Sequence, residues 1–410
     1  MAGIEWTMMR FALLCDDPLA SPVIDALSDH VGGHQLTFAV LATKRTDNLL
    51  HHREAITFVE RCEDLPLERE VDAVLVGGAD QLILDGAKQL ATSGIPILFV
   101  PQAGQGSTFA YELSLIRDDN QVSLFPLFWH RYDAAAIELR KVLSEGRLGK
   151  IQFLQLNRGL GQSSTNTPLS QPVVDAELLN DADLLRWLIG DYDQVTCLRT
   201  ASTSDGVMMQ SVVLAGRSLP EANWSIAPVT GPDQWWLTVR GDGGVAELHR
   251  EGSSRCWICE IDGSCVAGDD RGTASRVLDA FASATATRKS SATTPEKIVG
   301  SEWGELVKCF ETVDATHRSI KRRRTIELHF EPMSERAIFK TQMTAMGCGL
   351  LVATFFMTLC FLGIASVVPL PQRVLEVLRI LVFAPLIIFL IAQILLPLTR
   401  PSSNEQPASK

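Results

Sequence analysis

Two carboxylates occupy the turn between the first apolar strand and the first helix of the chain. Phe11–Leu14 are typical of a short buried strand and Val23–Leu27 of the apolar face of a helix, with Asp16 and Asp17 between them. A helix N-terminus after a strand commonly binds phosphate. Here each carboxylate would repel an anion at about 4 Å by roughly 1–4 kcal/mol, and Pro18 has no amide hydrogen to donate. The sequence predicts a turn that caps itself.

Groups that could transfer a proton occur in two later segments. His130 lies in FWHRYD, and the segment 175–190, DAELLNDADLLRWLIG, carries several acids on a predicted helix. Imidazole is the side chain whose unperturbed pKa is closest to neutral pH. His130 would therefore suit acid or base catalysis if it faces a cleft. A lone histidine more often has a structural role, and both interpretations stay open.

Three cysteines lie close together, at positions 256, 259 and 265. The alternation of SRCWICEI is typical of a strand, which would turn Cys256 and Cys259 to opposite faces. No second Cys or His pair follows at the spacing of a zinc site. The sequence therefore predicts no metal site. The chain's nine cysteines have no regular spacing, which is typical of free thiols facing the cytosol.

The elements that must position these groups change character along the chain. As far as about Asn120, apolar strands such as VDAVLVGG and IPILFV alternate with helical stretches, which predicts a Rossmann-type, doubly wound parallel sheet. After a charged helix at 133–149, longer strands and the GDGG hairpin predict an α+β domain with a mostly antiparallel sheet. The segment 271–294, rich in Ala, Ser and Thr, is expected to be loosely ordered.

Two uncharged apolar runs lie near the end of the chain, from Thr341 to Gln372 and from Ile380 to Leu398. A helix that crosses a bilayer needs about 20 apolar residues, so the runs predict a transmembrane hairpin. We expect four regions: a nucleotide-binding-type domain at 8–125, the α+β domain at 126–335, the hairpin at 341–398 with helices near 343–368 and 378–398, and a polar tail at 399–410.

Charge suggests where the protein is located and what it does not bind. Basic residues that flank the hairpin (Arg336, Lys340, Arg400 and Lys410) favour both termini in the cytoplasm. We therefore expect a multi-pass membrane protein whose soluble part is cytoplasmic. The N-terminus has no basic region before an apolar run, so it does not resemble a secretory signal. A net charge of −11 argues against a nucleic-acid partner.

Several segments occur in the order known from one family of enzymes. VDAVLVGGAD is similar to the family's fourth strand, SEGRLGKIQFLQ to its link between domains, DADLLRWLIGD to the helix that closes its active site, and LTVRGDGGVAEL to a hairpin of its sheet. From Arg10 to about Glu331 the chain thus resembles the Gfo/Idh/MocA oxidoreductases. The resemblance implies NAD(P) as cofactor, a sugar or polyol as substrate, and a lysine and a histidine that handle the proton.

The positions that the resemblance assigns to the cofactor have changed. Cys15, Asp17 and Ala20 stand where the glycines of G-x-G-x-x-G would lie, and side chains at the first two would crowd a diphosphate. The acid that would bind the ribose is absent, with Lys44 and Arg45 in its place. These two could suit the extra phosphate of NADP, or they could be solvated loop charges.

The catalytic positions have changed as well. Pro101 stands at the lysine of the family's Glu-Lys-Pro strand end, and it cannot exchange a proton. In the family's Asp-x-Gly-x-His-x-x-Asp helix, Ala176 and Asn180 replace the first acid and the histidine, whereas Asp183 is retained. Asp175 and Asp181 lie one residue out of register. A helix would turn them about 100° away.

Three hypotheses follow. The first is a membrane-anchored protein that is degenerate at its nucleotide and catalytic sites, with NAD(P) lost, and that serves as a binding or scaffolding module. The second is an active, divergent NAD(P)-dependent oxidoreductase acting on a sugar-like or polyol-like compound, with His130 in a new role. In the third, the chain pairs with itself or with a related oxidoreductase through the open face of the second sheet. Exposed Trp235 and Trp236 would mark that face, although aromatic residues that alternate in a strand more often belong to the core.

Overall fold

The computed structural model describes residues 8–40, 56–67, 71–201, 206–251, 257–261, 263–289, 302–328 and 354–359. The chain divides into two compact units, Met1–Phe330 and Glu331–Lys410. Of the second unit only the helical residues 354–359 are described, so the rest of the predicted hairpin lies outside the described residues. Within the ranges given above, no helix has both the length and the apolar composition needed to cross a membrane.

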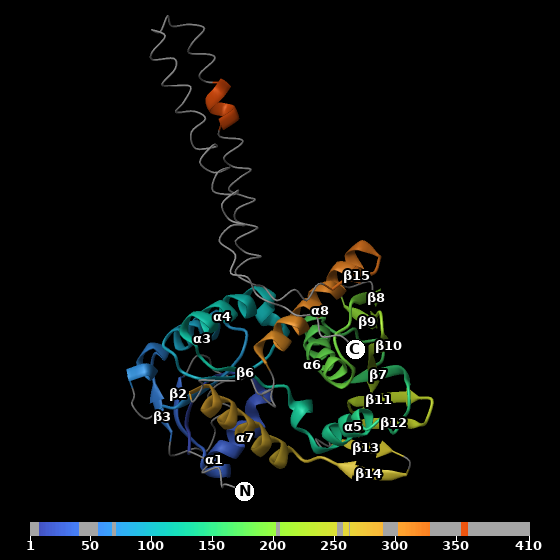
Figure 1. Cartoon of the computed structure of the whole chain (residues 1–410), viewed down its shortest axis with the longest axis horizontal. Helices are drawn as coiled ribbons and strands as arrows, with labels where there is room; N and C mark the ends of the chain where they lie inside the picture. Colours follow the sequence, from blue (N-terminus) through green and yellow to red (C-terminus); the bar gives the residue numbers. More distant parts are fainter. Residues whose placement is uncertain are drawn as a thin grey trace, which may run out of the picture. The chain divides into compact units, whose positions relative to one another are not determined.

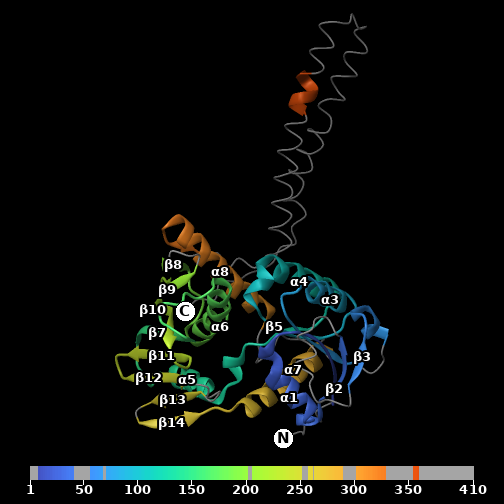
Figure 2. The same cartoon turned by 180° about the vertical axis from the view of Figure 1, so that it is seen from behind.

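The first sheet has six strands, all paired in parallel, in the order β3-β2-β1-β4-β5-β6. Figure 1 labels β2, β3 and β6 of this sheet, and Figure 2 labels β5. The predicted Rossmann-type sheet is therefore confirmed. The chain order reverses between β1 and β4, and ligands of such sheets bind beyond the carboxyl ends of the strands at this point. The strands are β1 (Arg10–Cys15), β2 (Gln35–Val40), β3 (Thr57–Val59), β4 (Ala73–Gly77), β5 (Ile97–Val100) and β6 (Leu124–Pro126).

Helices cover both faces of this sheet. Successive residues of a strand point to opposite faces, so Leu14 packs on the side of α3 (Gln81–Thr92) and α4 (Gly106–Asn120), while Leu13 packs on the side of α1 (Ser21–Ser28). Because strands buried on both faces must be apolar throughout, β1 and β4 are continuous apolar runs.

The segment 271–294, expected to be loosely ordered, is a helix as far as Lys289: α7 (Asp270–Lys289), which packs against α1. Residues 290–294 lie outside the described residues. Its composition has little helical signal, but apolar residues recur every three or four positions and are buried on the first sheet. These residues are Ala274, Val277, Leu278 and Phe281. The expectation was wrong because tertiary burial of one narrow stripe stabilises a helix that composition alone does not favour.

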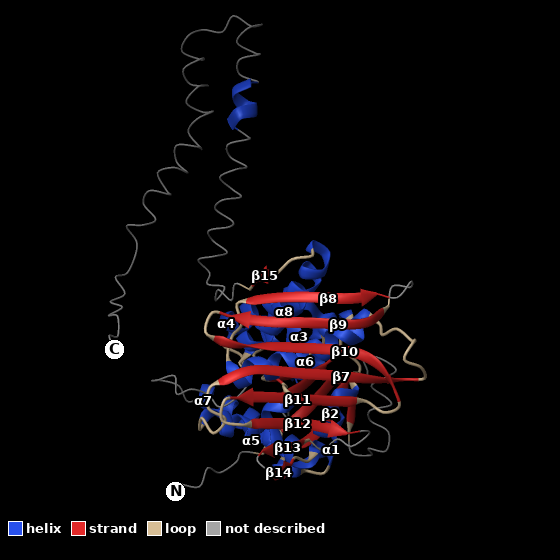
Figure 3. Cartoon of the chain, turned by 90° about the vertical axis from the view of Figure 1, so that its right-hand side faces the viewer, coloured by secondary structure: helices blue, strands red, loops and turns tan. Residues whose placement is uncertain are grey.

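The second sheet has nine strands, in the order β14-β13-β12-β11-β7-β10-β9-β8-β15 (Figure 3). Only β7 and β10 pair in parallel, and the other pairings are antiparallel, as predicted. The strands are β7 (Ile151–Gln162), β8 (Gln194–Ala201), β9 (Val207–Gly216), β10 (Leu219–Thr230), β11 (Gln234–Gly241), β12 (Val245–Glu251), β13 (Ile258–Ile261), β14 (Ser264–Ala267) and β15 (Ile326–Glu327).

Three helices lie against one face of the second sheet, behind the strands in Figure 3: α5 (Ala134–Ser144), α6 (Gln171–Ile189) and α8 (Trp303–Arg322). Helix α8 packs on α6 and β8, and also on α4 of the first sheet. At its start the indole of Trp303 donates to the carbonyl oxygen of Ala110, at 2.8 Å. The two sheets are therefore joined by shared helices, and α6 is held between them.

Candidate functional site

A cleft of about 400 Å³ lies where the turn after β1 meets the second sheet. One side comes from the short helical turns η1 (Pro18–Ala20) and η5 (Trp129–Tyr132), and another from α6. Strands β7 and β12 contribute Arg158 and Arg250. This is where the strand order of the first sheet would place a ligand.

The cleft brings together three of the residues selected from the sequence. His130, Ala176 and Asn180 all line it, although His130 is far from the other two in the chain. Asn180 donates its side-chain amide to the carbonyl oxygen of Ala176 at 3.1 Å, one turn back along α6. The cleft lining does not include Pro101 or Asp183.

The turn after β1 satisfies its own amides. The Asp17 carboxylate is 2% exposed and accepts a hydrogen bond from the backbone N–H of Leu19 at 2.9 Å. Its second oxygen accepts from the side-chain amide of Gln102. Burial raises the pKa of Asp17, against the lowering by these hydrogen bonds. As predicted, the turn caps itself, although Asp17 caps η1 rather than α1, whose N-cap is Ala20.

Cys15 and Ala20 also lie in the interior. The Cys15 sulfur accepts a hydrogen bond from the backbone N–H of Asp17 at 3.4 Å, and burial raises the pKa of the Cys15 thiol above its usual range. Ala20 is fully buried at the end of η1. Lys44 and Arg45, the other two residues assigned to the cofactor, lie outside the described residues.

The ends of the neighbouring strands β4 and β5 are filled by side chains. The Asp16 carboxylate lies against Gly78, in the space that a Cβ on that glycine would need. The Gln105 amide donates to the carbonyl oxygens of Gly78 and Val100, at 2.9 and 3.1 Å. Three side chains from two loops therefore lie in the crevice above the sheet: Asp16 from the turn after β1, and Gln102 and Gln105 from the turn after β5.

A buried ionic network forms the rear of the cleft. The Arg158 guanidinium contacts both carboxylate oxygens of Asp181, one of them at 3.0 Å, and also forms an ion pair with Glu177. Burial alone would lower the pKa of Arg158, but the two carboxylates raise it above its usual range. Burial opposes ionisation of Asp181, yet Arg158 holds the pKa of that carboxyl below its usual range. Both groups of the central pair are therefore charged.

The buried Asp181 is held by two tryptophans as well. The indole N–H groups of Trp224 and Trp235 donate to its two oxygens at 2.7 and 3.0 Å. Trp235 is only 2% exposed. Of the two interpretations, an exposed face is wrong for Trp235 and a place in the core is right, because alternation along β11 turns it toward α6 while the neighbouring Trp236 faces outward. Asp181 lies behind the cleft wall.

His130 lies in an aromatic surrounding. Its ring stacks on Trp235 at 5.8 Å between centroids and meets the edge of Trp257 at 4.8 Å. Nε2 lies 3.8 Å from an oxygen of Asp181, while Nδ1 is buried and has no hydrogen-bond partner in the described part of the chain. Burial lowers the pKa of His130 to about 4, against the opposing charge of Asp181. The imidazole is therefore neutral at pH 7.

The sequence interpretation missed Arg158, although a signal was present. Leu154, Leu156 and Leu160 alternate along β7 and are buried, and Arg158 occupies the same face. A charge at a core-facing position needs a buried partner, which Asp181 supplies. Asp175, the other out-of-register acid, accepts from Gln171 and pairs with His317 at 2.9 Å, away from the cleft lining.

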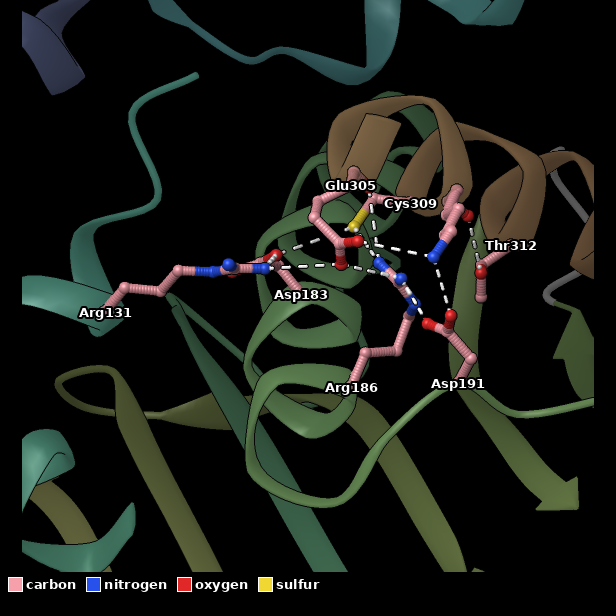
Figure 4. A network of polar contacts seen from close by, with 8 residues as sticks. Arg131, Asp183, Arg186, Asp191, Glu305, Cys309 and Thr312 are labelled. Atoms are coloured by element: carbon pink, nitrogen blue, oxygen red, sulfur yellow. Dashed lines mark hydrogen bonds and ion pairs between the residues drawn. The ribbon is translucent and has the colours of Figure 1, made fainter. Parts of the chain in front are cut away.

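A second polar network surrounds the retained Asp183 (Figure 4). The Arg131 guanidinium contacts both oxygens of Asp183, one at 2.8 Å. Arg186 forms ion pairs with Glu305 on α8 and with Asp191 beyond the end of α6. A larger hollow of about 1580 Å³ adjoins these arginines, but none of the proton-transfer positions lines it. We therefore assign the candidate site to the smaller cleft and a structural role to this network.

Metal ligation has no support in the ranges that the structure describes. They contain no group of three or more His, Cys, Asp or Glu side chains arranged to hold a metal ion. Of the three clustered cysteines, Cys259 lies buried on β13 and Cys265 is exposed on β14, whereas Cys256 lies outside the described residues.

Comparison with known proteins finds relatives by structure alone. No protein-family profile matches the chain, and no curated protein sequence matches it. Among solved structures, the aldose–aldose oxidoreductase of Caulobacter crescentus, in complex with glycerol, has a TM-score of 0.64 at 17% identity, covering 78% of this chain and 100% of that one. Myo-inositol 2-dehydrogenase of Lactobacillus plantarum has a TM-score of 0.60 at 15% identity, covering 79% and 100%.

A third structure contains a bound cofactor. It is an oxidoreductase of Agrobacterium radiobacter in complex with NAD⁺, L-tartaric acid and magnesium, with a TM-score of 0.60 at 14% identity over 78% of this chain and 98% of that one. Identities this low establish the fold and nothing finer. The fold implied by the resemblance to the Gfo/Idh/MocA oxidoreductases is confirmed. It is the fold of NAD(P)-dependent sugar and polyol oxidoreductases.

Proposed function

We propose that this chain is a binding module with the fold of a sugar or polyol oxidoreductase, anchored to a membrane and no longer dependent on NAD(P). Its own side chains close the dinucleotide crevice, while the cleft beside α6 holds a small hydroxyl-bearing ligand.

The observation that carries the proposal is the position of the Asp17 carboxylate. It accepts from the N–H of Leu19, one of the amides that a diphosphate would use at this turn, and Pro18 has no N–H to offer. The Asp16 carboxylate adds negative charge beside Gly78. A dinucleotide diphosphate would have to displace both carboxylates and overcome their repulsion. These residues do not fit the cofactor.

The positions assigned to proton transfer support the same conclusion. Pro101 has no ionisable group, and Asn180 is engaged with the carbonyl oxygen of Ala176. Neither can act as a general acid or base. The cleft nevertheless keeps groups suited to binding. Nδ1 of the neutral His130 can accept a hydrogen bond from a hydroxyl. The Arg250 guanidinium lies over the Trp257 ring, 5.2 Å from the ring centroid.

The anchor is proposed from the sequence. The runs 341–372 and 380–398 contain no charged residue and each is long enough to cross a bilayer. Flanking basic residues support a cytoplasmic location for the folded unit. Resistance of the full chain to alkaline carbonate extraction from membranes is expected, whereas release by carbonate would remove the anchor from the proposal.

The decisive experiment is a calorimetric titration of the full chain in detergent with NADH and with NADPH. We expect no heat of binding up to millimolar cofactor. The Asp17→Gly/Gln102→Ala variant, which removes the carboxylate and its partner, tests the electrostatic reason, because it should bind either cofactor more tightly than the parent. Micromolar binding by the parent chain would overturn the proposal and show that the two carboxylates move aside.

One observation favours the second candidate, an active oxidoreductase on a sugar-like or polyol-like substrate. His130 lines the cleft together with Asn180, and its buried Nδ1 has no hydrogen-bond partner in the described part of the chain, so it could replace the missing base. Reduction of NAD⁺ or NADP⁺ with any of a panel of sugars and polyols, abolished in His130→Gln, would favour this candidate over the binding module.

Self-association or pairing with a related oxidoreductase is proposed for the outer face of the second sheet. Trp236 is 36% exposed there and stacks on His249 at 4.5 Å. Light scattering of the full chain in detergent, compared with Trp236→Glu, tests this part. A parent chain with the mass of a monomer would exclude self-association.

A further inference from the structure

The C-terminal end of α8 carries five positive side chains within seven residues. Arg318, Lys321 and Arg322 lie in the last turns of the helix, and Arg323 and Arg324 follow it directly. All five are exposed, and in the part of the chain that the structure describes none of their side chains has an ion pair or a hydrogen bond. Five like charges in one place repel one another. Among the described residues, no local partner explains their presence.

Helix stability accounts for only part of this basic cluster. Lys321 and Arg322 would interact favourably with the helix dipole. Arg323, however, adopts the left-handed conformation with φ +52°, where glycine or asparagine is favoured. Arg324 lies beyond the helix, and its carbonyl oxygen accepts from the Ser319 hydroxyl at 2.8 Å. The backbone of this turn is thus held in place while its side chains project outward.

The turn is also fixed to the second sheet. The same Ser319 hydroxyl accepts a hydrogen bond from the backbone N–H of Cys197 on β8, at 2.9 Å, and Ile326 pairs with Val195. The basic cluster is therefore a preformed surface of the folded unit. Such a surface loses little conformational freedom in its backbone when it binds a partner.

The charge of the partner follows from the contrast with the rest of the chain. The whole chain has 37 basic and 48 acidic residues, yet residues 318–326 contain no acid. An anionic surface is therefore attracted to this end of α8 and repelled by the molecule as a whole. That combination disfavours a long nucleic acid, which would meet the acidic remainder of the surface.

The position along the chain identifies the anionic surface. Sixteen residues, 325–340, separate Arg324 from the first uncharged run, and they can span at most about 55 Å. Arg336 and Lys340 lie within this link. Basic residues just outside a membrane span are attracted to the anionic headgroups of the cytoplasmic leaflet. This step rests on the proposed membrane anchor.

We propose that the basic cluster at the end of α8 binds the anionic phospholipid surface next to the proposed hairpin, and so fixes the orientation of the folded unit on the membrane. The attraction is electrostatic, so it requires acidic lipid and weakens as salt shortens the screening length.

Arginine footprinting of the full chain tests the proposal. The chain is reconstituted into nanodiscs of phosphatidylcholine, with or without phosphatidylglycerol, and treated with phenylglyoxal, and modification is measured by peptide mass spectrometry. We expect several-fold slower modification of the four arginines of the cluster, Arg318, Arg322, Arg323 and Arg324, with the acidic lipid, and recovery of the rate in high salt. The exposed Arg147, between α5 and β7, serves as internal control and should react equally in both lipids.

Two variants that each lack four positive charges are compared by the rate at which Arg318 is modified. In Lys321→Gln/Arg322→Gln/Arg323→Gln/Arg324→Gln, Arg318 should lose its protection. It should keep that protection when four basic residues elsewhere are changed: Arg61→Gln/Lys141→Gln/Arg147→Gln/Lys150→Gln. Equal modification in both lipids would overturn the proposal, as would protection by an added oligonucleotide but not by acidic lipid.

Carbonate extraction reports separately on the hairpin. A chain released by carbonate but protected on acidic nanodiscs would retain this proposal and lose the anchor.

Discussion

Gln102 donates its side-chain amide to the Asp17 carboxylate and so joins the loop after β5 to the turn after β1. Since β4 lies between these strands in the sheet, the bond crosses the crevice where an oxidoreductase of this fold would hold a dinucleotide. Asp17 is almost fully buried, so the bond also satisfies a charge that would otherwise lack a second donor. This one contact therefore joins two loops at the crevice and stabilises a buried carboxylate.

Replacing Gln102 should destabilise the protein. Gln102→Ala leaves a buried carboxylate with one donor fewer, for which we expect a loss of about 1–3 kcal/mol in the free energy of unfolding. Urea unfolding of the full chain in detergent, followed by tryptophan fluorescence, measures it. Gln152→Ala, at an exposed position on β7, is the control and should change the stability little. Equal effects of the two substitutions would contradict the role of the bond.

Removal of the Asp181 charge should be more harmful. Asp181→Asn keeps the shape of the side chain but leaves the Arg158 guanidinium, only 8% exposed, opposite a neutral group. Breaking a buried pair in this way costs about 3–5 kcal/mol. Asp118→Asn, in an exposed pair with Arg117, is expected to cost less than about 1 kcal/mol. A small effect at Asp181, measured by the same unfolding experiment, would show that Glu177 alone compensates Arg158.

The stability that depends on His130 should fall as the pH falls. Its pKa is about 4 in the folded chain and 6.5 in the unfolded chain, so between these values the unfolded state binds the extra proton. Acidification from pH 6.5 to 4 should therefore remove about 3 kcal/mol. His130→Gln lacks this titration. As the pH decreases, the unfolding free energy of the parent should fall relative to that of the variant.

His317 provides a comparison of opposite sign. Its hydrogen bond to Asp175 raises the pKa of His317, so the folded state holds the proton more tightly. That stabilisation is complete below the unfolded value of 6.5 and is lost as the pH rises through the folded pKa. His317→Gln should therefore cost more stability at pH 5 than at pH 8. Parallel pH profiles for the two histidine variants would refute at least one of the two assignments.

The cysteines should differ sharply in reactivity. Burial raises the pKa of the Cys309 thiol to about 12, against the lowering by Arg186, and Cys15 is likewise buried, whereas Cys265 is exposed. Because the thiolate is the reactive form, iodoacetamide at neutral pH should label Cys265 and spare Cys15 and Cys309. In guanidinium chloride all three should react. Native-state labelling of Cys309 would mean that α6 and α8 separate readily.

Much of the fold could be predicted because it follows local patterns. Continuous apolar runs of four to six residues identified β1, β4 and β5, and alternation with the GDGG turn identified β11 and β12. Helix α7 could not be predicted, because its narrow apolar stripe becomes meaningful only when α1 and the first sheet lie against it. Trp235 and Trp236 are adjacent in the sequence and equally apolar. Which of the two is buried depends on which face of the second sheet the helices cover.

The sequence by itself determined what depends on near neighbours. The turn Cys15–Leu19 caps itself because Asp17 reaches the N–H two residues ahead, and Pro101 cannot transfer a proton in any fold. The tertiary structure alone decided which distant groups meet. Arg158 on β7 contacts Asp181 on α6, and Gln102 contacts Asp17, which is 85 positions away in the chain. Such pairs depend on how the layers pack, and burial then makes each unpaired charge costly enough to require its partner.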